Sequence, residues 1–274
     1  MKAIIKLILL ALLALALLAV GLNIWGYLTL GVLEPASNPD RDSGANRVVM
    51  VFGATGSVGD GLLEAAMDDG EVEEIYVVSR RTSPRIEAGV ASGKVELILQ
   101  QDFTDYSELA DILTQVNTVL WALGTSSLNV DDATYTWIHV DFPVAFVKQW
   151  LAARTDAPMS FHSVTGMGTD PNGSAHWARE KGRAEIEVAA MAQGTGLRTF
   201  GYHSAFIRPA SDQANMGHYI LEALLRPGSL AIASKDLGNA MLEISARTRE
   251  LPNGAVIDNA DSIAYGRAYR GDAG

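Results

Sequence analysis

Residues 47–67 read RVVMVFGATGSVGDGLLEAAM, and this stretch decides the fold. After Arg47, an uninterrupted apolar run over 48–52 leads directly into a turn containing three glycines, and apolar residues at helical spacing follow in 62–67. The order strand, glycine turn, helix is typical of a dinucleotide-binding unit. In such a unit Gly53 permits a tight bend, Gly56 lets the backbone approach a pyrophosphate, and Gly59 allows the helix to pack closely on the strand. A structural turn that holds no ligand is the alternative interpretation.

Short apolar runs recur further along the chain, with helical stretches between most of them. We expect strands at 75–78, 95–99, 118–122, 159–162 and 197–202, and helices at 106–114, 135–153 and 177–193. Strands and helices that alternate in this way form parallel sheets joined by right-handed crossovers. The sequence therefore predicts an α/β fold, a Rossmann-type doubly wound parallel sheet. Beyond Pro209 we expect only two further helices, at 216–225 and 237–246, and a loose tail from Tyr265 onward.

The residues after the second predicted strand bear on which dinucleotide is bound. An acidic residue there accepts hydrogen bonds from the free 2′-hydroxyl of NAD(H), whereas guanidinium groups favour the 2′-phosphate of NADP(H). This chain has Ser79, Arg80 and Arg81 at that place. We therefore expect NADP(H) in preference to NAD(H), with a solvated pair of loop arginines as the alternative interpretation.

The chain begins with a long apolar segment. Between Leu7 and Leu33 only Asn23 and Thr29 are clearly polar. A helix of that length, at about 1.5 Å per residue, exceeds a hydrocarbon core of about 30 Å. The segment predicts an N-terminal transmembrane helix that remains as a single-pass anchor. A cleaved secretory signal and an in-plane or re-entrant segment are the alternatives.

The predicted domain organisation follows from this segment. We expect a membrane anchor in 1–33, in contact with the bilayer over 3–33, then a linker in 34–46, and an NAD(P)-binding domain with a short C-terminal substrate region in 47–274. A weak positive-inside bias places the amino terminus in the cytoplasm and the domain outside. Reduced nicotinamide nucleotides are cytoplasmic metabolites, however, and this argument favours a membrane protein whose domain lies in the cytoplasm.

Composition excludes several classes of function. The chain has 274 residues and no cysteine, which rules out thiolate nucleophiles, zinc ribbons, iron–sulfur clusters and disulfide frameworks. Its formal net charge of −11 is unsuited to a nucleic-acid partner. His139, His162 and His218 lack the spacing of a shared ion, so we expect no metal site.

These residues resemble the atypical short-chain dehydrogenase/reductases, particularly the NmrA-like and Tat-interacting-protein-like NAD(P)H-binding group. The resemblance runs from about Arg47 to Pro209 and includes Trp137–Asp141 and Phe206–Pro209. It implies that cofactor contacts come from the nucleotide turn, from an adenine-contacting pair and from the loop after the fourth strand. The corresponding residues are Gly53, Ala54, Thr55, Gly56, Ser57, Val58 and Gly59 for the turn, Asp102 and Phe103 for the pair, and Ala122, Leu123 and Gly124 for the loop.

The resemblance also implies a catalytic serine after the fifth strand and a Tyr-x-x-x-Lys motif on the next helix. In such enzymes the tyrosine transfers a proton, while the lysine holds the nicotinamide ribose and lowers the pKa of the tyrosine. Here Ser163 and Thr165 stand in the serine region and Lys181 matches the lysine, but the tyrosine position is Trp177. An indole N–H does not transfer a proton at neutral pH. His176 and the pair Tyr202–His203 are candidate substitutes, each with a purely structural role as the alternative.

Two functions are therefore open. The first is a membrane-anchored NADP(H)-dependent oxidoreductase acting on a small apolar substrate. The second is a non-catalytic NADP(H)-binding redox sensor or assembly module with a protein partner, which Trp177 favours. The identity of the substrate is not indicated by the sequence.

Overall fold

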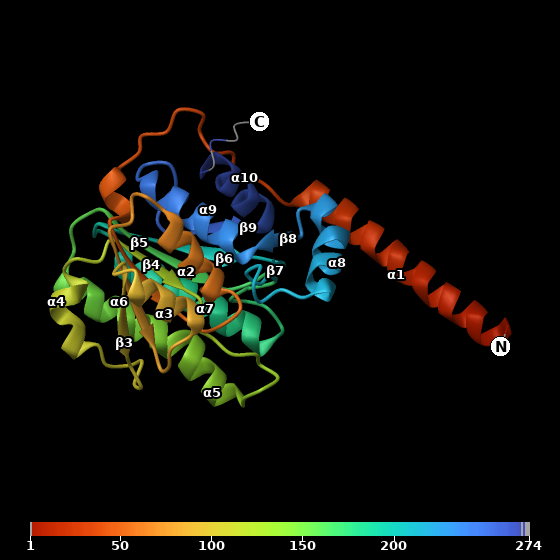
Figure 1. Cartoon of the computed structure of the whole chain (residues 1–274), viewed down its shortest axis with the longest axis horizontal. Coiled ribbons are helices and arrows are strands. Elements are labelled where there is room, and N and C mark those ends of the chain that lie inside the picture. The colour runs from red at the N-terminus through yellow and green to blue at the C-terminus, as the bar shows by residue number, and fades with distance from the viewer. Residues whose placement is uncertain (1, 270, 272–274) are drawn as a thin grey trace.

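A single parallel sheet forms the centre of the molecule (Figure 1). The computed structural model describes residues 2–269 and residue 271. The sheet has seven strands in the order β3-β2-β1-β4-β5-β6-β9, and every neighbouring pair is parallel. The strands are β1 (Val48–Phe52), β2 (Glu74–Ser79), β3 (Val95–Leu99), β4 (Thr118–Trp121), β5 (Met159–Val164), β6 (Leu197–His203) and β9 (Ala255–Asp258). The predicted Rossmann-type sheet is confirmed.

Helices cover both faces of the sheet, which explains why β1 is apolar at every position. Val49 and Val51 pack into one core with the helices α2 (Gly59–Asp68), α3 (Pro84–Ala91), α9 (Ser234–Ala246) and α10 (Asn259–Tyr269). Met50 and Phe52 pack into the other core, whose helices are α4 (Ala110–Leu113), α6 (Phe142–Ala153) and α7 (His176–Ala192). Alternate residues of each strand therefore serve opposite layers of the fold.

The C-terminal part of the chain differs from its predicted form. The tail prediction was wrong up to Tyr269, because α10 is a regular helix and Tyr265 is fully buried against α9. Strand β9, which forms an edge of the sheet, was not predicted. The predicted helix at 135–153 consists of α5 (Asp132–Thr136), a π-helical turn at Trp137–Asp141 and α6.

The remaining short elements lie between β6 and α9 or in connections. A two-stranded parallel sheet is formed by β7 (Phe206–Arg208) and β8 (Ala231–Ala233). Between these strands lie α8 (Met216–Leu225) and the 3₁₀ turn η4 (Arg226–Gly228). Two further 3₁₀ turns are η1 (Ser43–Asn46) and η2 (Ser107–Leu109).

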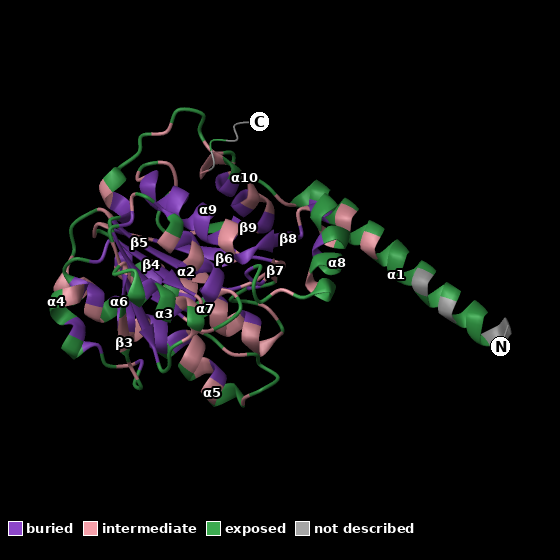
Figure 2. Ribbon diagram, in the orientation of Figure 1, coloured by how far each residue is buried: buried purple, intermediate pink, exposed green. Residues whose placement is uncertain are grey.

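The N-terminal helix α1 (Lys2–Thr29) projects from the globular part of the chain, and α8 lies beside its domain-proximal end (Figure 1). Ile4–Thr29 is long and apolar enough to be a candidate membrane span. Nearly all of its described residues are exposed (Figure 2).

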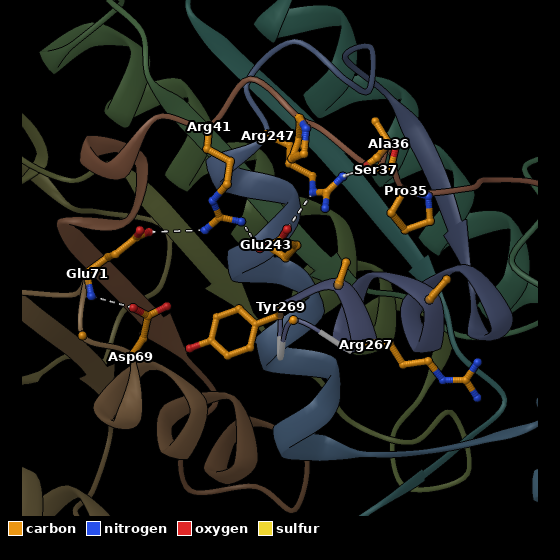
Figure 3. A pocket seen from close by; sticks show the side chains of 15 residues that line it. Pro35, Ala36, Ser37, Arg41, Asp69, Glu71, Glu243, Arg247, Arg267 and Tyr269 are labelled. Carbon is orange, nitrogen blue, oxygen red and sulfur yellow. Dashed lines mark hydrogen bonds and ion pairs between the residues drawn. The ribbon is translucent and has the colours of Figure 1, made fainter. Parts of the chain in front are cut away.

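The segment after α1 is fastened to the last third of the chain. The N–H of Gly31 donates to the Asp258 carboxylate at 2.8 Å, and the N–H of Leu33 donates to Asp261 at 2.8 Å. Further along, Arg41 forms ion pairs with Glu243 and with Glu71, as Figure 3 shows. Residues 31–41 therefore follow the surface of the domain through defined contacts.

Candidate functional site

A cleft opens at the carboxyl ends of the strands, where β1 lies between β2 and β4 and the strand order reverses. Ligands of doubly wound folds bind at this switch point. The cleft has a volume of about 350 Å³, and its lining comes from the ends of β1, β2 and β4 and from the loop after β3. The lining residues are Gly53, Thr55, Gly56, Val78, Ser79, Arg80, Arg81, Phe103, Ala122, Leu123 and Gly124.

The three glycines of the turn have different surroundings. Gly53 adopts a φ of +76°, and a Cβ atom there would lie 2.4 Å from the Ala122 carbonyl oxygen. A Cβ on Gly59 would lie 2.2 Å from the Gly53 oxygen, so a side chain would push α2 away from β1. Gly56 is exposed, and the only close neighbour of a Cβ there would be the Gly53 oxygen at 3.3 Å. The backbone of the turn is therefore packed on its inner side and open at Gly56.

The other residues of the turn lie around the start of α2. Val58 precedes the first helical residue, no side chain caps this helix end, and Ser57 is exposed. Among the described residues, none accepts a hydrogen bond from the N–H groups of Ser57, Val58 or Gly59. Unpaired N–H groups at a helix start attract anions such as phosphate. Ala54, in contrast, is fully buried and packs in the core.

Arg80 and Arg81 lie at the far end of the same cleft. Both residues are exposed and line it, and within the described part of the chain neither guanidinium has a carboxylate within 4.0 Å. Arg85, one turn further on, is instead held by Asp60 at 2.9 Å and by Asp212 at 2.8 Å. Two guanidinium groups are thus available to an anionic ligand, while the third is engaged.

Of the expected adenine-contacting pair, Phe103 lines the cleft and Asp102 does not. Phe103 is buried and lines the cleft. The Asp102 carboxylate points into its own turn, where it accepts hydrogen bonds from the Thr104 N–H at 2.8 Å and the Thr104 hydroxyl at 2.6 Å. These hydrogen bonds lower the pKa of Asp102. The carboxylate of Asp102 is not among the groups that face the cleft.

Lys181 lies on α7 below a second, much smaller cavity of about 20 Å³. Its Nζ donates to the Thr165 carbonyl oxygen at 2.5 Å. Burial lowers the pKa of Lys181 to about 8, and the nearby Glu185 carboxylate opposes this shift. Ser163 also lines the cavity, but its hydroxyl donates to the Phe200 carbonyl oxygen at 3.2 Å.

A polar chain runs beside Lys181, and of its three members the sequence indicated Thr165 and His203 but not Glu185. The Thr165 hydroxyl donates to Glu185 at 2.6 Å, and Nε2 of His203 lies 3.1 Å from the same carboxylate oxygen. Glu185 follows Lys181 by one helical turn, so both side chains lie on the same face of α7. That spacing, together with Gly201 on the facing strand, is the signal that could have revealed Glu185, since a Cβ on Gly201 would lie 2.1 Å from its carboxylate.

The other candidate substitutes for the missing tyrosine are engaged elsewhere. The Tyr202 hydroxyl is fully buried and lies 2.8 Å from Nδ1 of His162. His176 contacts the Asp132 carbonyl oxygen on α5 at 3.2 Å. Trp177 packs over Gly168, where a Cβ would lie 3.3 Å from its ring. Of the candidate substitutes His176, Tyr202 and His203, only His203 reaches the surroundings of Lys181.

His139 lies on the opposite side of the small cavity. Its ring stacks on Tyr135 at a centroid distance of 4.1 Å, and Nε2 lies 3.1 Å from the Thr125 nitrogen. Burial, aided by the positive charge of Lys181, lowers the pKa of His139 to about 4. The ring is therefore neutral at pH 7. Within the described part of the chain, no group of three or more acidic or histidine side chains is arranged to hold a metal ion.

Comparison with known proteins agrees with this geometry. Residues 49–171 match the NAD dependent epimerase/dehydratase family. A curated relative, leucinostatins biosynthesis cluster protein T of Purpureocillium lilacinum, is 24% identical over 209 residues, which are 76% of this chain and 74% of the relative.

Solved structures share the fold at low sequence identity. An oxidoreductase of the short-chain dehydrogenase/reductase family from Burkholderia thailandensis is 16% identical with a TM-score of 0.56, over 83% of this chain and 93% of that one. The Bordetella bronchiseptica enzyme WbmF in complex with NAD⁺ and UDP is 15% identical with a TM-score of 0.58, over 85% and 81%. Structures of this fold were solved with NAD and with NADPH. These solved structures share the Rossmann-type fold of this chain.

Proposed function

We propose that this chain, an NAD(P)-binding protein of the atypical short-chain dehydrogenase/reductase type, is a membrane-anchored NADP(H)-dependent oxidoreductase that acts on a small apolar substrate. The observation that carries the proposal is the cleft at the switch point, which combines an open glycine turn with two unpaired arginines. Several solved structures with the same fold contain NAD or NADPH. We also propose that the chain prefers NADP(H) and is related to the NmrA-like group. In the same proposal α1 is a membrane anchor, and the residues around Lys181 are catalytic.

The cleft residues fit an extended dinucleotide. The amides of Ser57, Val58 and Gly59 would hold the pyrophosphate, because Gly56 leaves the approach to them open. Arg80 and Arg81 would pair with a 2′-phosphate, which an NAD molecule lacks. Phe103 would contact the adenine, and Ala122 to Gly124 would line the path toward the nicotinamide.

The residues around Lys181 would transfer a proton to the substrate during the reaction. A bound NADPH supplies a hydride, and the oxygen of a reduced carbonyl then needs a proton. His203 lies at the outer end of the chain through Glu185 to the Thr165 hydroxyl, and the two nitrogens of an imidazole ring can donate and accept a proton. Lys181 would hold the nicotinamide ribose and place positive charge near this chain. In this arrangement the His203–Glu185–Thr165 chain supplies the proton that the tyrosine supplies in the family.

Membrane anchoring is the second part of the proposal. The exposed apolar surface of α1 supports insertion in a bilayer, and a cytoplasmic location of the domain gives it access to NADPH. Placing a Rossmann domain on an anchor brings its site near substrates dissolved in lipid. We therefore place the chain in a membrane with its domain in the cytoplasm.

Nucleotide binding to the full chain in detergent micelles tests the cofactor assignment. We expect NADPH to bind at least about tenfold more tightly than NADH, a difference of about 1.4 kcal/mol. The Arg80→Ala/Arg81→Ala variant should lose this preference. Arg249→Ala should keep it, because Arg249 is exposed and pairs with Asp40. Equal affinity for NADH and NADPH would refute NADP specificity, and no binding of either would refute the cofactor site.

Turnover tests the catalytic part. We expect NADPH oxidation with a long-chain aldehyde or ketone in the same micelles, and a loss of about a hundredfold or more in Lys181→Ala and in His203→Phe. Retained NADPH binding in His203→Phe would separate chemistry from binding. Unchanged turnover in His203→Phe would exclude the proposed proton route.

A second function, a non-catalytic NADP(H)-binding sensor or assembly module, is favoured by two observations. The tyrosine position is Trp177, and the cavity beside Lys181 has only about 20 Å³, close to the space of one water molecule. This function predicts tight NADPH binding without turnover of any carbonyl compound. Robust turnover in Trp177→Phe would exclude it.

A further inference from the structure

The helix α8 exposes its apolar residues and buries a charged one, which is the reverse of the usual pattern. Its only buried residue is Glu222, and the side facing away from the protein is apolar. Large exposed side chains of α8 are Met216 at 74%, Tyr219 at 41%, Ile220 at 54%, Leu221 at 40% and Leu224 at 52%. A helix on the surface of a soluble domain shows the opposite pattern, with apolar residues inside.

The inward carboxylate explains why α8 holds this orientation. Glu222 accepts from Nε of Arg208 at 2.7 Å and pairs with Arg226 at 2.9 Å. The Arg208 guanidinium also lies over the Tyr219 ring, 4.9 Å from its centroid. A buried ion pair whose partners hydrogen-bond in this way holds the helix at a defined rotation. The apolar face of α8 is therefore fixed toward the outside.

The apolar face lies next to the anchor. Nδ2 of Asn23 on α1 donates to the Leu224 carbonyl oxygen at 2.7 Å, and its Oδ1 accepts from the Gly228 N–H at 2.6 Å. Gly26 follows Asn23 on the same helix face and is buried against Gly228, where a Cβ would lie 2.2 Å from the Gly228 oxygen. The end of α1 and the end of α8 thus form one joined unit (Figure 1).

The position of this joint along α1 fixes its depth in a bilayer. Ile4–Leu22 lies before the joint and spans about 28 Å at about 1.5 Å per residue, which matches a hydrocarbon core of about 30 Å. Trp25 and Tyr27 follow directly and are exposed at 45% and 78%, and such residues gather at the boundary between headgroups and acyl chains. The joint at Asn23 therefore lies at the membrane interface, and so does α8.

We propose that α8 is an interfacial helix: Met216, Ile220 and Leu224 enter the headgroup–acyl boundary of the bilayer that α1 spans. This rests on the anchoring part of the proposed function and is independent of the redox chemistry. The lipid surface is the occupant because the apolar face is continuous with α1 and lies at interfacial depth. The domain is then held at two points, α1 and α8, and its orientation relative to the membrane is fixed.

The absence of cysteine from the chain allows single labels at chosen positions. We would label Ile220→Cys on α8, Leu13→Cys in the middle of α1 and Leu99→Cys at the end of β3 with an environment-sensitive fluorophore. Leu99 is the matched control, because it is 66% exposed and apolar but lies on the strand at the opposite edge of the sheet. Full-chain protein is reconstituted in phosphatidylcholine vesicles containing phosphatidylglycerol, with spin-labelled lipids as quenchers.

The label at Ile220 should shift its emission to the blue and lose most of its intensity with a shallow spin label. The label at Leu13 should be quenched best by a deep spin label, and the label at Leu99 should respond to neither. If Leu13 responds and Ile220 behaves like Leu99, the anchor holds and the interfacial role of α8 is refuted. If Leu13 does not respond, the anchor itself is refuted. A blue shift at Ile220 without lipid quenching, and dependent on protein concentration, would assign the face to a second copy of the chain and overturn the proposal.

Discussion

At the scale of single residues, Lys181 carries the clearest titration effect. Burial lowers its pKa from the ordinary 10.5 to about 8, so the folded protein binds fewer protons than the unfolded chain between these values. Below pH 8 the buried Lys181 is charged in the folded protein, and its burial destabilises the fold by the full amount. This destabilisation decreases as the pH rises toward 10.5. The free energy of unfolding should therefore rise over this range by on the order of 3 kcal/mol relative to Lys181→Met. Urea denaturation of both proteins at several pH values measures it, and parallel pH profiles would contradict the lowered pKa.

The glycines of the nucleotide turn should separate stability from binding. Gly59→Ala places a methyl group 2.2 Å from the Gly53 oxygen, so the melting temperature should fall, with a loss of about 1–3 kcal/mol from overpacking. Gly56→Ala points its methyl group into the cleft, so it should leave the melting temperature nearly unchanged while weakening NADPH binding by about tenfold or more. Equal effects of both variants on stability would contradict the view that only Gly56 faces the ligand.

Sequence patterns located the cleft residues because strand, turn and helix follow one another directly along the chain. Gly53, Gly56 and Phe103 all line the cleft to which they were assigned. Glu185 was not found, because its role depends on contact with His203. The direction of the His203 side chain is set by the folded sheet and cannot be derived from the sequence. Ser163 sits in the expected region, but only the structure shows that its hydroxyl is directed at the Phe200 carbonyl.

At the scale of elements, the joint between α1 and η4 depends on close backbone approach. Gly26→Ala would bring a methyl group 2.2 Å from the Gly228 oxygen, whereas a Cβ on Gly21 has no atom within 4 Å. We expect Gly26→Ala in vesicles to expose the segment 31–42 to protease, and Gly21→Ala to leave it protected. Equal protection of both variants would mean that the joint does not hold the anchor against the domain.

The elements most easily predicted were those with a strong apolar period. Strands β1 to β6 were located from apolar runs, whereas β9 has only four residues and one fully buried side chain, Ile257. Helix α10 lacks an apolar stripe, and it is fixed at its start by Asp258 and Asp261, which accept from each other's N–H groups. The sequence alone does not show which carboxylates will cap a helix in the folded chain. The residues from Tyr265 onward, which have no apolar period, therefore resembled a loose tail.

At the scale of the whole molecule, a buried ion-pair group joins the segment after α1 to α9. Arg247 is 4% exposed, donates to Glu243 at 2.7 Å and also donates to the Ala36 carbonyl oxygen at 2.9 Å (Figure 3). Removing one partner of a buried pair weakens the compensation of the other charge, and without Arg247 the buried Glu243 would retain only the partly exposed Arg41. Arg247→Met should therefore lower the free energy of unfolding by about 3–5 kcal/mol.

The matched control is Arg249→Met. Arg249 is 84% exposed and forms an exposed ion pair with Asp40 at 3.0 Å, so its loss should cost less than about 1 kcal/mol. Denaturant unfolding of the full chain in micelles measures both variants. A similar small cost for the two arginines would show that residues 35–41 are fastened by other contacts.

The joint between α1 and η4 also sets an order of events during synthesis. Asn23 leaves the ribosome long before Gly228, its hydrogen-bond partner, and the carboxylates that hold Gly31 and Leu33 come later still, at Asp258 and Asp261. In the membrane-anchored chain that we propose, the apolar helix therefore enters the bilayer before the domain that contacts it has been synthesised. The contacts that hold the domain against Asn23 and the segment after α1 close only after translation has passed residue 261.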